Sequence, residues 1–209
     1  MDAALVLVVL TNLAMLGTNN MGNSIRLLAL QGLALGASVA LIAPDEGART
    51  LLLAVGVASL KGVLYPWALL RVLRKVKATT EDQPLVGYTL TFLTGIAALG
   101  AGFVISARLP PPSTAVSALA LPVAVATIVA GLALTITRRT ALAQVLGYVV
   151  LENGIFLFAL VLVGGLPLLL ELGGLLEVFF AVFVMGIAVD RISREFSTTN
   201  VNGLDRLRG

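Results

Sequence analysis

The sequence predicts an all-α membrane protein with about seven transmembrane helices. Of its 209 residues, 58% are hydrophobic and only 12% are charged, whereas about a quarter of the residues in a soluble domain are charged. The mean hydropathy is +1.02. Most of the apolar runs approach the roughly 20 residues that a helix needs to cross the hydrocarbon core. Seven such segments are expected at about residues 3–18, 25–43, 50–70, 85–107, 114–136, 141–163 and 168–189.

The first two segments carry isolated polar residues. The first segment is short and contains Asn12. Residues 1–4 lack the basic start of a signal peptide, so this segment is expected to be a retained span. Turn-like residues 19–24 precede the second segment, which has Arg26 near its start and Gln31 one turn further in.

The third segment carries Lys61 near its middle. Pro66 has no N–H, so the carbonyl of Gly62 one turn back is expected to lose its helical partner. Both a polar spot beside the lysine and a simple packing kink are consistent with this proline. A basic loop closes this three-helix N-terminal unit, predicted at residues 1–84, and contains Arg71, Arg74, Lys75 and Lys77.

The rest of the chain is predicted to contain a linking transmembrane helix within residues 85–112 and a second three-helix unit at 113–189, followed by a cytoplasmic tail at 190–209. The linking helix has no charge and is rich in glycine and threonine. Because small residues let helices approach closely in a membrane, close packing is expected at Gly95, Gly100 and Gly102.

The distribution of charge predicts the orientation of the spans. With seven spans, eleven of the 14 basic residues fall on one side of the membrane, and only Arg49 and Arg108 fall opposite. Because basic residues are retained on the cytoplasmic side, the N-terminus is expected outside and the C-terminus in the cytoplasm. The eleven are Arg26, Arg71, Arg74, Lys75, Lys77, Arg138, Arg139, Arg191, Arg194, Arg206 and Arg208.

Two polar positions suggest an internal repeat. Arg26 and Gln31 recur at the same separation as Arg139 and Gln144. A parallel three-helix repeat predicts this spacing. Two matches in apolar sequence also arise by chance, so both interpretations stay open.

Glu152 is the main candidate functional residue. It lies within the apolar run 141–163, roughly 20 Å from the nearer boundary at about 1.5 Å per residue. An ionisable group at that depth is costly and usually functional. Gln144 and Tyr148 precede it at helical spacing, and Asn153 follows it. We expect Glu152 to carry protons along this face; a neutral glutamate that bonds a neighbouring helix is the alternative.

Lys61 and Glu177 are further candidates for the proton path. A buried lysine either exchanges a proton or pairs permanently with a carboxylate. Glu177 or a partner subunit is expected to supply that carboxylate.

The chain contains no histidine and no cysteine. This excludes haem with two His ligands, iron–sulfur clusters, zinc sites built from His or Cys, disulfides and His-dependent catalytic triads. No catalytic centre and no cofactor are therefore expected in this chain. The net charge of +3 is small, so nucleic-acid binding is not expected.

Residues 144–156, QVLGYVVLENGIF, resemble the signature of component E of hydrogenase-4-type membrane complexes. The resemblance extends over the whole chain in length and span layout, and its specific motifs lie in the last third. Further stretches similar to that family are Glu171–Gly173, Glu177, residues 182–187, residues 196–197 and residues 204–209.

The last three spans of that family are similar to the K subunit of respiratory complex I and to the C subunit of multisubunit sodium/proton antiporters. By this resemblance, Glu152 corresponds to the membrane glutamate in the middle helix of the K subunit. Val182 occupies the place of the second glutamate of the K subunit, so the resemblance leaves the role of Glu177 open.

The resemblance implies an integral membrane subunit of a complex-I-like oxidoreductase, such as a group 4 NiFe hydrogenase or formate hydrogenlyase, that translocates protons or sodium. It implies NiFe and iron–sulfur centres in partner subunits. The implied partners are antiporter-like and anchor membrane subunits, peripheral hydrogenase-type subunits and the lipid bilayer of a bacterial or archaeal cytoplasmic membrane. A free-standing small ion transporter and a structural spacer subunit are the alternatives.

Overall fold

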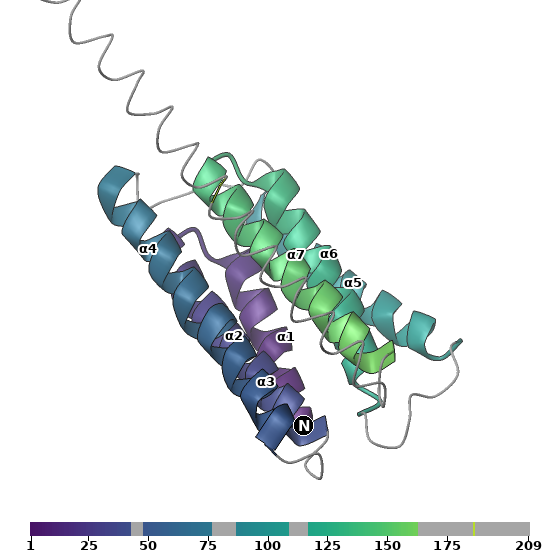
Figure 1. Ribbon diagram of the computed structural model, residues 1–209. Coiled ribbons are helices and arrows are strands. Elements are labelled where there is room, and N and C mark those ends of the chain that lie inside the picture. Colours follow the sequence, from purple (N-terminus) through teal and green to yellow (C-terminus); the bar gives the residue numbers. More distant parts are fainter. Residues whose placement is uncertain (43–47, 77–86, 109–116, 163–185, 187–209) are drawn as a thin grey trace, which may run out of the picture.

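The computed structural model describes residues 1–42, 48–76, 87–108, 117–162 and Gly186, and every regular element in these ranges is a helix (Figure 1). Three of these elements follow one another without a break and form a single rod: α3, a π-helical turn (here the π turn) and α4. In chain order, the elements are α1 (Asp2–Gly17), α2 (Met21–Ile42), α3 (Ala48–Ser59), the π turn (Leu60–Leu64), α4 (Tyr65–Val76), α5 (Tyr88–Ser106), α6 (Ala120–Thr137) and α7 (Ala141–Leu162).

The chain is a multi-pass membrane protein, as its composition predicts. Within the described residues, five helices are long and apolar enough to cross a membrane, and α1 is a shorter apolar helix. These six correspond to the first six expected segments. The expected seventh segment at 168–189 and the tail lie outside the described residues, so the count of seven, the orientation and the division into units stay predictions.

The second helix begins earlier than expected. α2 starts at Met21 rather than near residue 25. The side-chain oxygen of Asn20 accepts the backbone N–H of Asn23 at 3.1 Å, which satisfies one of the amides that have no partner at a helix start. The turn between α1 and α2 is therefore shorter than residues 19–24.

The fifth expected segment corresponds to α6, which begins later than expected, at Ala120 rather than near residue 114. The hydroxyl of Ser117 accepts the N–H of Leu119 at 3.2 Å just before it. Pro122 therefore falls in the first turn of α6, where a missing N–H removes no helical hydrogen bond.

Four helices form the centre of the bundle: α1, α2, α6 and α7. α6 packs most extensively on α7, while α1 contacts α2 and α6, and α2 reaches α7. The rod of α3 and α4 lies against α2 on one side, and α5 lies against α1 and α6 on the other (Figure 1). The rod and α5 expose large apolar side chains such as Leu52 and Leu90, which is expected of surfaces that face lipid or partner subunits.

Glycines allow the close contact between α6 and α7. A Cβ atom added at any of three glycines would lie closer than 3.0 Å to the backbone of the opposite helix. The backbones can approach only because these positions have no side chain. The three are Gly131 on α6 and Gly147 and Gly154 on α7.

Helix α5 fits the packing prediction only in part. Gly95 and Gly102 lie against Leu16 and Pro122, as expected of close helix contacts. At Gly100, however, no atom of the described part of the chain lies within 4 Å of an added Cβ, so the prediction of close packing is wrong there within the described residues.

The buried apolar side chains form two clusters, one toward each end of the bundle. On α1, Val8 belongs to one cluster and Met15 to the other, and Asn12 lies between them. The same order recurs on α2, on the rod, on α6 and on α7. The residues between the clusters, here called the polar layer, are Asn12, Gln31, Lys61, Thr127, Glu152 and Asn153.

Candidate functional site

An ion pair between Lys61 and Glu152 lies in the polar layer. The ammonium nitrogen Nζ of Lys61 donates to Oε1 of Glu152 at 2.6 Å. The lysine side chain is 0% exposed and the glutamate side chain 8% exposed. Each residue lies near the middle of an apolar helix that can cross the membrane. A charge alone at this depth is costly, and a short, charge-assisted contact offsets much of that cost.

Two aromatic rings surround the ammonium group. Its nitrogen lies 5.1 Å from the ring centroid of Phe156 and 6.0 Å from that of Tyr65. Both distances are within the range of a cation–π attraction. The rings therefore supply electrostatic stabilisation to Lys61 while keeping water away from it.

The backbone around Lys61 is expanded by one residue. The N–H of Tyr65 donates to the carbonyl of Leu60, which is the five-residue hydrogen bond of a π helix. Pro66, the next residue, has no N–H to donate. The sequence indicated that Pro66 disturbs the helix near Lys61, and the disturbance takes the form of the π turn.

Helix α2 approaches this expanded backbone closely. A Cβ atom at Gly32 would collide with the backbone of Lys61 and Gly62. Gly32 therefore brings α2 into direct contact with the π turn, so its neighbour Gln31 lies at the level of the ion pair.

A directional network of hydrogen bonds extends from α7 across the bundle. Nδ2 of Asn153 donates to Oε1 of Gln31 at 2.9 Å, and Nε2 of Gln31 donates to Oδ1 of Asn12 at 2.7 Å. Nδ2 of Asn12 then donates to Oγ1 of Thr127 at 2.8 Å, whose hydroxyl donates to the carbonyl of Val123 at 2.7 Å. We call these four side chains the amide network; it joins α7, α2, α1 and α6.

The structure places the predicted site residues in different surroundings. It brings Lys61 to Glu152, which supplies a carboxylate beside the lysine; Glu177 lies outside the described residues, so its expected contact with Lys61 stays a prediction. Asn153 enters the amide network. Gln144 instead donates to the carbonyl of Arg138 at 3.1 Å, near the start of α7. Tyr148 is half-buried and packs against the apolar cluster on that side.

Three residues of the polar layer were not predicted as site residues. Asn12 and Gln31 were noted only as polar positions, and Thr127 was not singled out. The signal that identifies them is a buried polar residue near the middle of an apolar helix, since a polar group in hydrocarbon must find a partner. Their partners, however, follow from which helices are neighbours.

Arg138 forms a second polar contact, at one end of the bundle. It is 4% exposed, and Nη2 of its guanidinium donates to the carbonyls of Met15 (3.1 Å) and Thr18 (2.8 Å). These carbonyls end α1, where helical N–H partners are missing. Arg138 was interpreted from the sequence only as a determinant of topology, together with Arg139, which is exposed.

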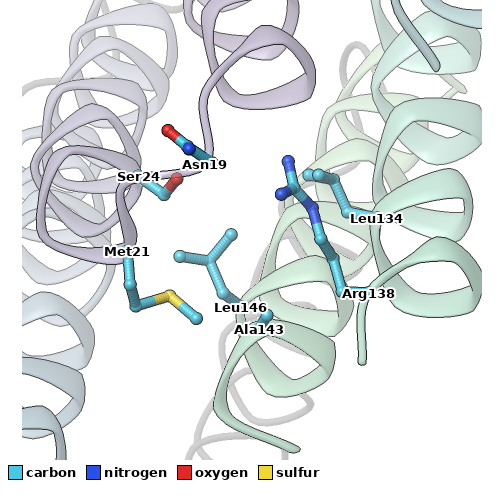
Figure 2. Close-up of a pocket in the computed structure, with 7 residues that line it drawn as sticks. All are labelled: Asn19, Met21, Ser24, Leu134, Arg138, Ala143 and Leu146. Carbon is cyan, nitrogen blue, oxygen red and sulfur yellow. The ribbon is translucent and has the colours of Figure 1, made fainter. Parts of the chain in front are cut away.

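A small cavity of about 10 Å³ lies beside Arg138, which is about the space that one water molecule needs. Figure 2 shows residues from α6 and α7 facing residues from the α1–α2 turn and the start of α2 across this cavity. The residues that line it are Asn19, Met21, Ser24, Leu134, Arg138, Ala143 and Leu146.

Among the residues that the structure describes, no group of three or more His, Cys, Asp or Glu side chains is placed to hold a metal ion. The chemistry available in the polar layer is proton exchange at one carboxylate and one amine, together with hydrogen bonding by amides and a hydroxyl.

Known proteins resemble this chain at the level of sequence. It is 35% identical over 187 residues to the uncharacterized protein Rv0085 of Mycobacterium tuberculosis, an alignment that covers 88% of this chain and 84% of that protein. It is 30% identical over 150 residues to hydrogenase-4 component E of Escherichia coli K12, with 71% and 69% covered, and equally to that of Shigella flexneri. No family model and no solved structure matches.

Proposed function

The chain belongs to the hydrogenase-4 component E family, and from this premise we propose that it is a membrane subunit of a hydrogenase-type complex in which Lys61 and Glu152 form part of a proton path. The observation that carries this proposal is the buried ion pair at mid-depth, with its 2.6 Å contact. Ionisable residues inside a membrane protein usually mark an ion pathway.

The geometry supports a simple loading cycle. A neighbouring ammonium favours the ionised form of a carboxylate, whereas burial without the ammonium favours the protonated form. If the contact between Lys61 and Glu152 opens, Glu152 gains a proton, and when the contact re-forms, the proton leaves. Redox-driven movement in a partner subunit would supply the energy that opens the contact.

The exposure of the two side chains indicates where the proton is exchanged. Glu152 keeps 8% of its side-chain surface exposed, whereas Lys61 keeps none. The carboxylate is therefore the more accessible of the two groups; in this proposal it exchanges the proton, and Lys61 acts as the charge that controls it.

The redox chemistry belongs to partner subunits in this proposal. They would contain the NiFe and iron–sulfur centres, and antiporter-like and anchor subunits would adjoin this chain in the cytoplasmic membrane of a bacterium or archaeon. Glu177, Gln144 and Tyr148 remain proposed as further residues of the proton path.

One observation favours a second candidate function, a structural spacer. The amide network joins four helices, and Arg138 joins α1 to α6. In a spacer, the charges would only hold the helices together, and the loss of one charge would reduce assembly rather than proton transfer.

The test is proton uptake by the intact complex in vesicles, with Glu152→Gln compared with wild type at equal assembly and equal redox turnover. We expect proton uptake to be lost while the subunits stay bound, because the amide fills the same space but cannot exchange a proton. Asp2→Asn removes an exposed carboxylate and is the matched control, for which uptake should be unchanged.

Unchanged proton uptake in Glu152→Gln would contradict the proposed proton path. Loss of the assembled complex, with no change in uptake per assembled complex, would support the spacer instead.

A further inference from the structure

We propose that the side-chain oxygen of Asn153 holds a buried water molecule in the polar layer that also contains the Lys61–Glu152 pair, and that the amide network orients this oxygen. The inference rests on and deepens the proposed proton path, since it places in that layer a group able to exchange protons, but the presence of the water can be tested separately.

The direction of the amide network is fixed at Thr127. A hydroxyl has one hydrogen to donate, and Thr127 donates it to the carbonyl of Val123. Its oxygen can therefore only accept, so Asn12 must present its NH₂ group to Thr127 and its oxygen to Gln31. The same requirement then applies to Gln31 and to Asn153, and it determines the orientation of each side-chain amide.

The open end of the network is consequently an acceptor. Oδ1 of Asn153 is buried and has no hydrogen-bond partner among the residues that the structure describes, in a residue that is 0% exposed. Buried side-chain oxygens are normally satisfied, and one that is not requires an explanation, such as a bound water or ion. Flipping the side-chain amide of Asn153 does not satisfy this oxygen, because the oxygen would then face the side-chain oxygen of Gln31, which is also an acceptor.

The ligand at this acceptor oxygen must be a hydrogen-bond donor or a cation. The two candidates are therefore a water molecule and a small cation. The polar layer already contains the positive charge of Lys61, which pairs with Glu152 at 2.6 Å, and this charge disfavours a second cation in the same layer. Hard cations also take about six or more oxygen ligands, whereas the other oxygens of the amide network already accept hydrogen bonds. Water fits both conditions.

Water at this position would also add to the polar layer a group that can exchange protons. Amide side chains hold their hydrogens, and the Thr127 hydroxyl points its hydrogen at a backbone carbonyl, so the amide network does not conduct protons toward α1 and α6. A water molecule can both accept and donate a proton. It would lie against Asn153, in the same polar layer as Glu152, and a buried water makes about three hydrogen bonds.

The test is a cryo-electron microscopy map of the assembled wild-type complex in which ordered waters are resolved, recorded once in sodium buffer and once in sodium-free potassium buffer. We expect a peak within about 3.2 Å of Oδ1 of Asn153 in both maps. Absence of the peak in both maps would overturn the proposal, and a peak in the sodium map alone would replace the water with a cation site.

A pair of variants tests the assignment of the peak. Asn153→Leu removes the acceptor and should lose the peak, whereas Gln144→Leu makes the same change on the same helix outside the amide network and should keep it. A peak that persists in Asn153→Leu would show that another group binds the water and would overturn the proposal. If Asn153→Leu does not assemble, the two wild-type maps decide.

The two proposals fail separately. Normal proton uptake in Glu152→Gln would contradict the proposed proton path but not the proposed water site. A missing water peak combined with lost uptake in Glu152→Gln would support the proton path and contradict the water site.

Discussion

At the scale of single residues, the effect on stability of substituting Lys61 or Glu152 depends mainly on whether the other residue of the pair is present. Replacing a whole buried ion pair with apolar side chains is often close to neutral, whereas removing one partner leaves a charge buried and is strongly destabilising. Because the two side chains contact at 2.6 Å, their substitutions should be strongly non-additive.

We expect Lys61→Met to destabilise this subunit in the complex by about 1–3 kcal/mol, since the buried carboxyl group of Glu152 loses its hydrogen-bond partner in the membrane interior even when it takes up a proton. Adding Glu152→Leu to the same chain should restore most of that stability, although not proton uptake. The temperature at which the subunit leaves the purified complex measures both effects.

Val63→Met is the control for the lysine substitution, because Val63 is 61% exposed and lies in the same turn of the rod. A double variant that is no more stable than Lys61→Met alone would show that the two side chains are not energetically coupled.

At the scale of helices, the contact between α6 and α7 depends on glycines, which have no side chain. Gly154→Ala should destabilise the bundle by about 1–3 kcal/mol, as overpacking does, because an added Cβ lies 2.5 Å from the backbone nitrogen of Ile128. The movement of α6 and α7 needed to fit the added Cβ would also disturb the polar layer, since Gly154 directly follows Asn153.

Gly100→Ala makes the same chemical change where nothing lies within 4 Å of the added atom. It should be neutral or stabilise α5 by up to about 1 kcal/mol, the gain of alanine over glycine in a helix. Thermal unfolding of complexes that contain either variant provides the comparison, and equal effects would contradict the role of glycine in the α6–α7 contact.

The sequence predicts much at this scale, because hydropathy alone identifies the apolar helices and the charge of Lys61 and Glu152 identifies the two ionisable residues within them. It does not pair them, because 91 residues separate the two and the pairing depends on how α2 brings the rod to α7. Pro66 signals a disturbed helix, but whether the backbone kinks or expands depends on the close approach of Gly32. Helix starts at Met21 and Ala120 depend on local side-chain caps, which hydropathy does not detect.

At the scale of the whole molecule, Arg138 connects the first helices of the chain to the later ones. We expect Arg138→Met to lower the stability of the subunit by about 1.5–3 kcal/mol, the contribution of hydrogen bonds to a charged group, because two carbonyls at the end of α1 lose their donor. The release temperature of the subunit from the complex measures this loss.

Arg139→Met is the matched control, because it removes the same charge from the next residue, which is exposed. It should change stability by no more than about 0.5 kcal/mol, as surface substitutions usually do. If both variants lose stability equally, the two arginines act through topology rather than through the contact of Arg138 with α1.

The distance in sequence between Lys61 and Glu152 also has a consequence for biosynthesis. At about 5–20 residues per second, the ribosome needs roughly 5–18 s to add the 91 residues that separate them. During that interval, Lys61 on the rod has already been synthesised, whereas Glu152, which supplies its carboxylate, has not. The nascent chain therefore carries Lys61 without the carboxylate of Glu152 until α7 has been made.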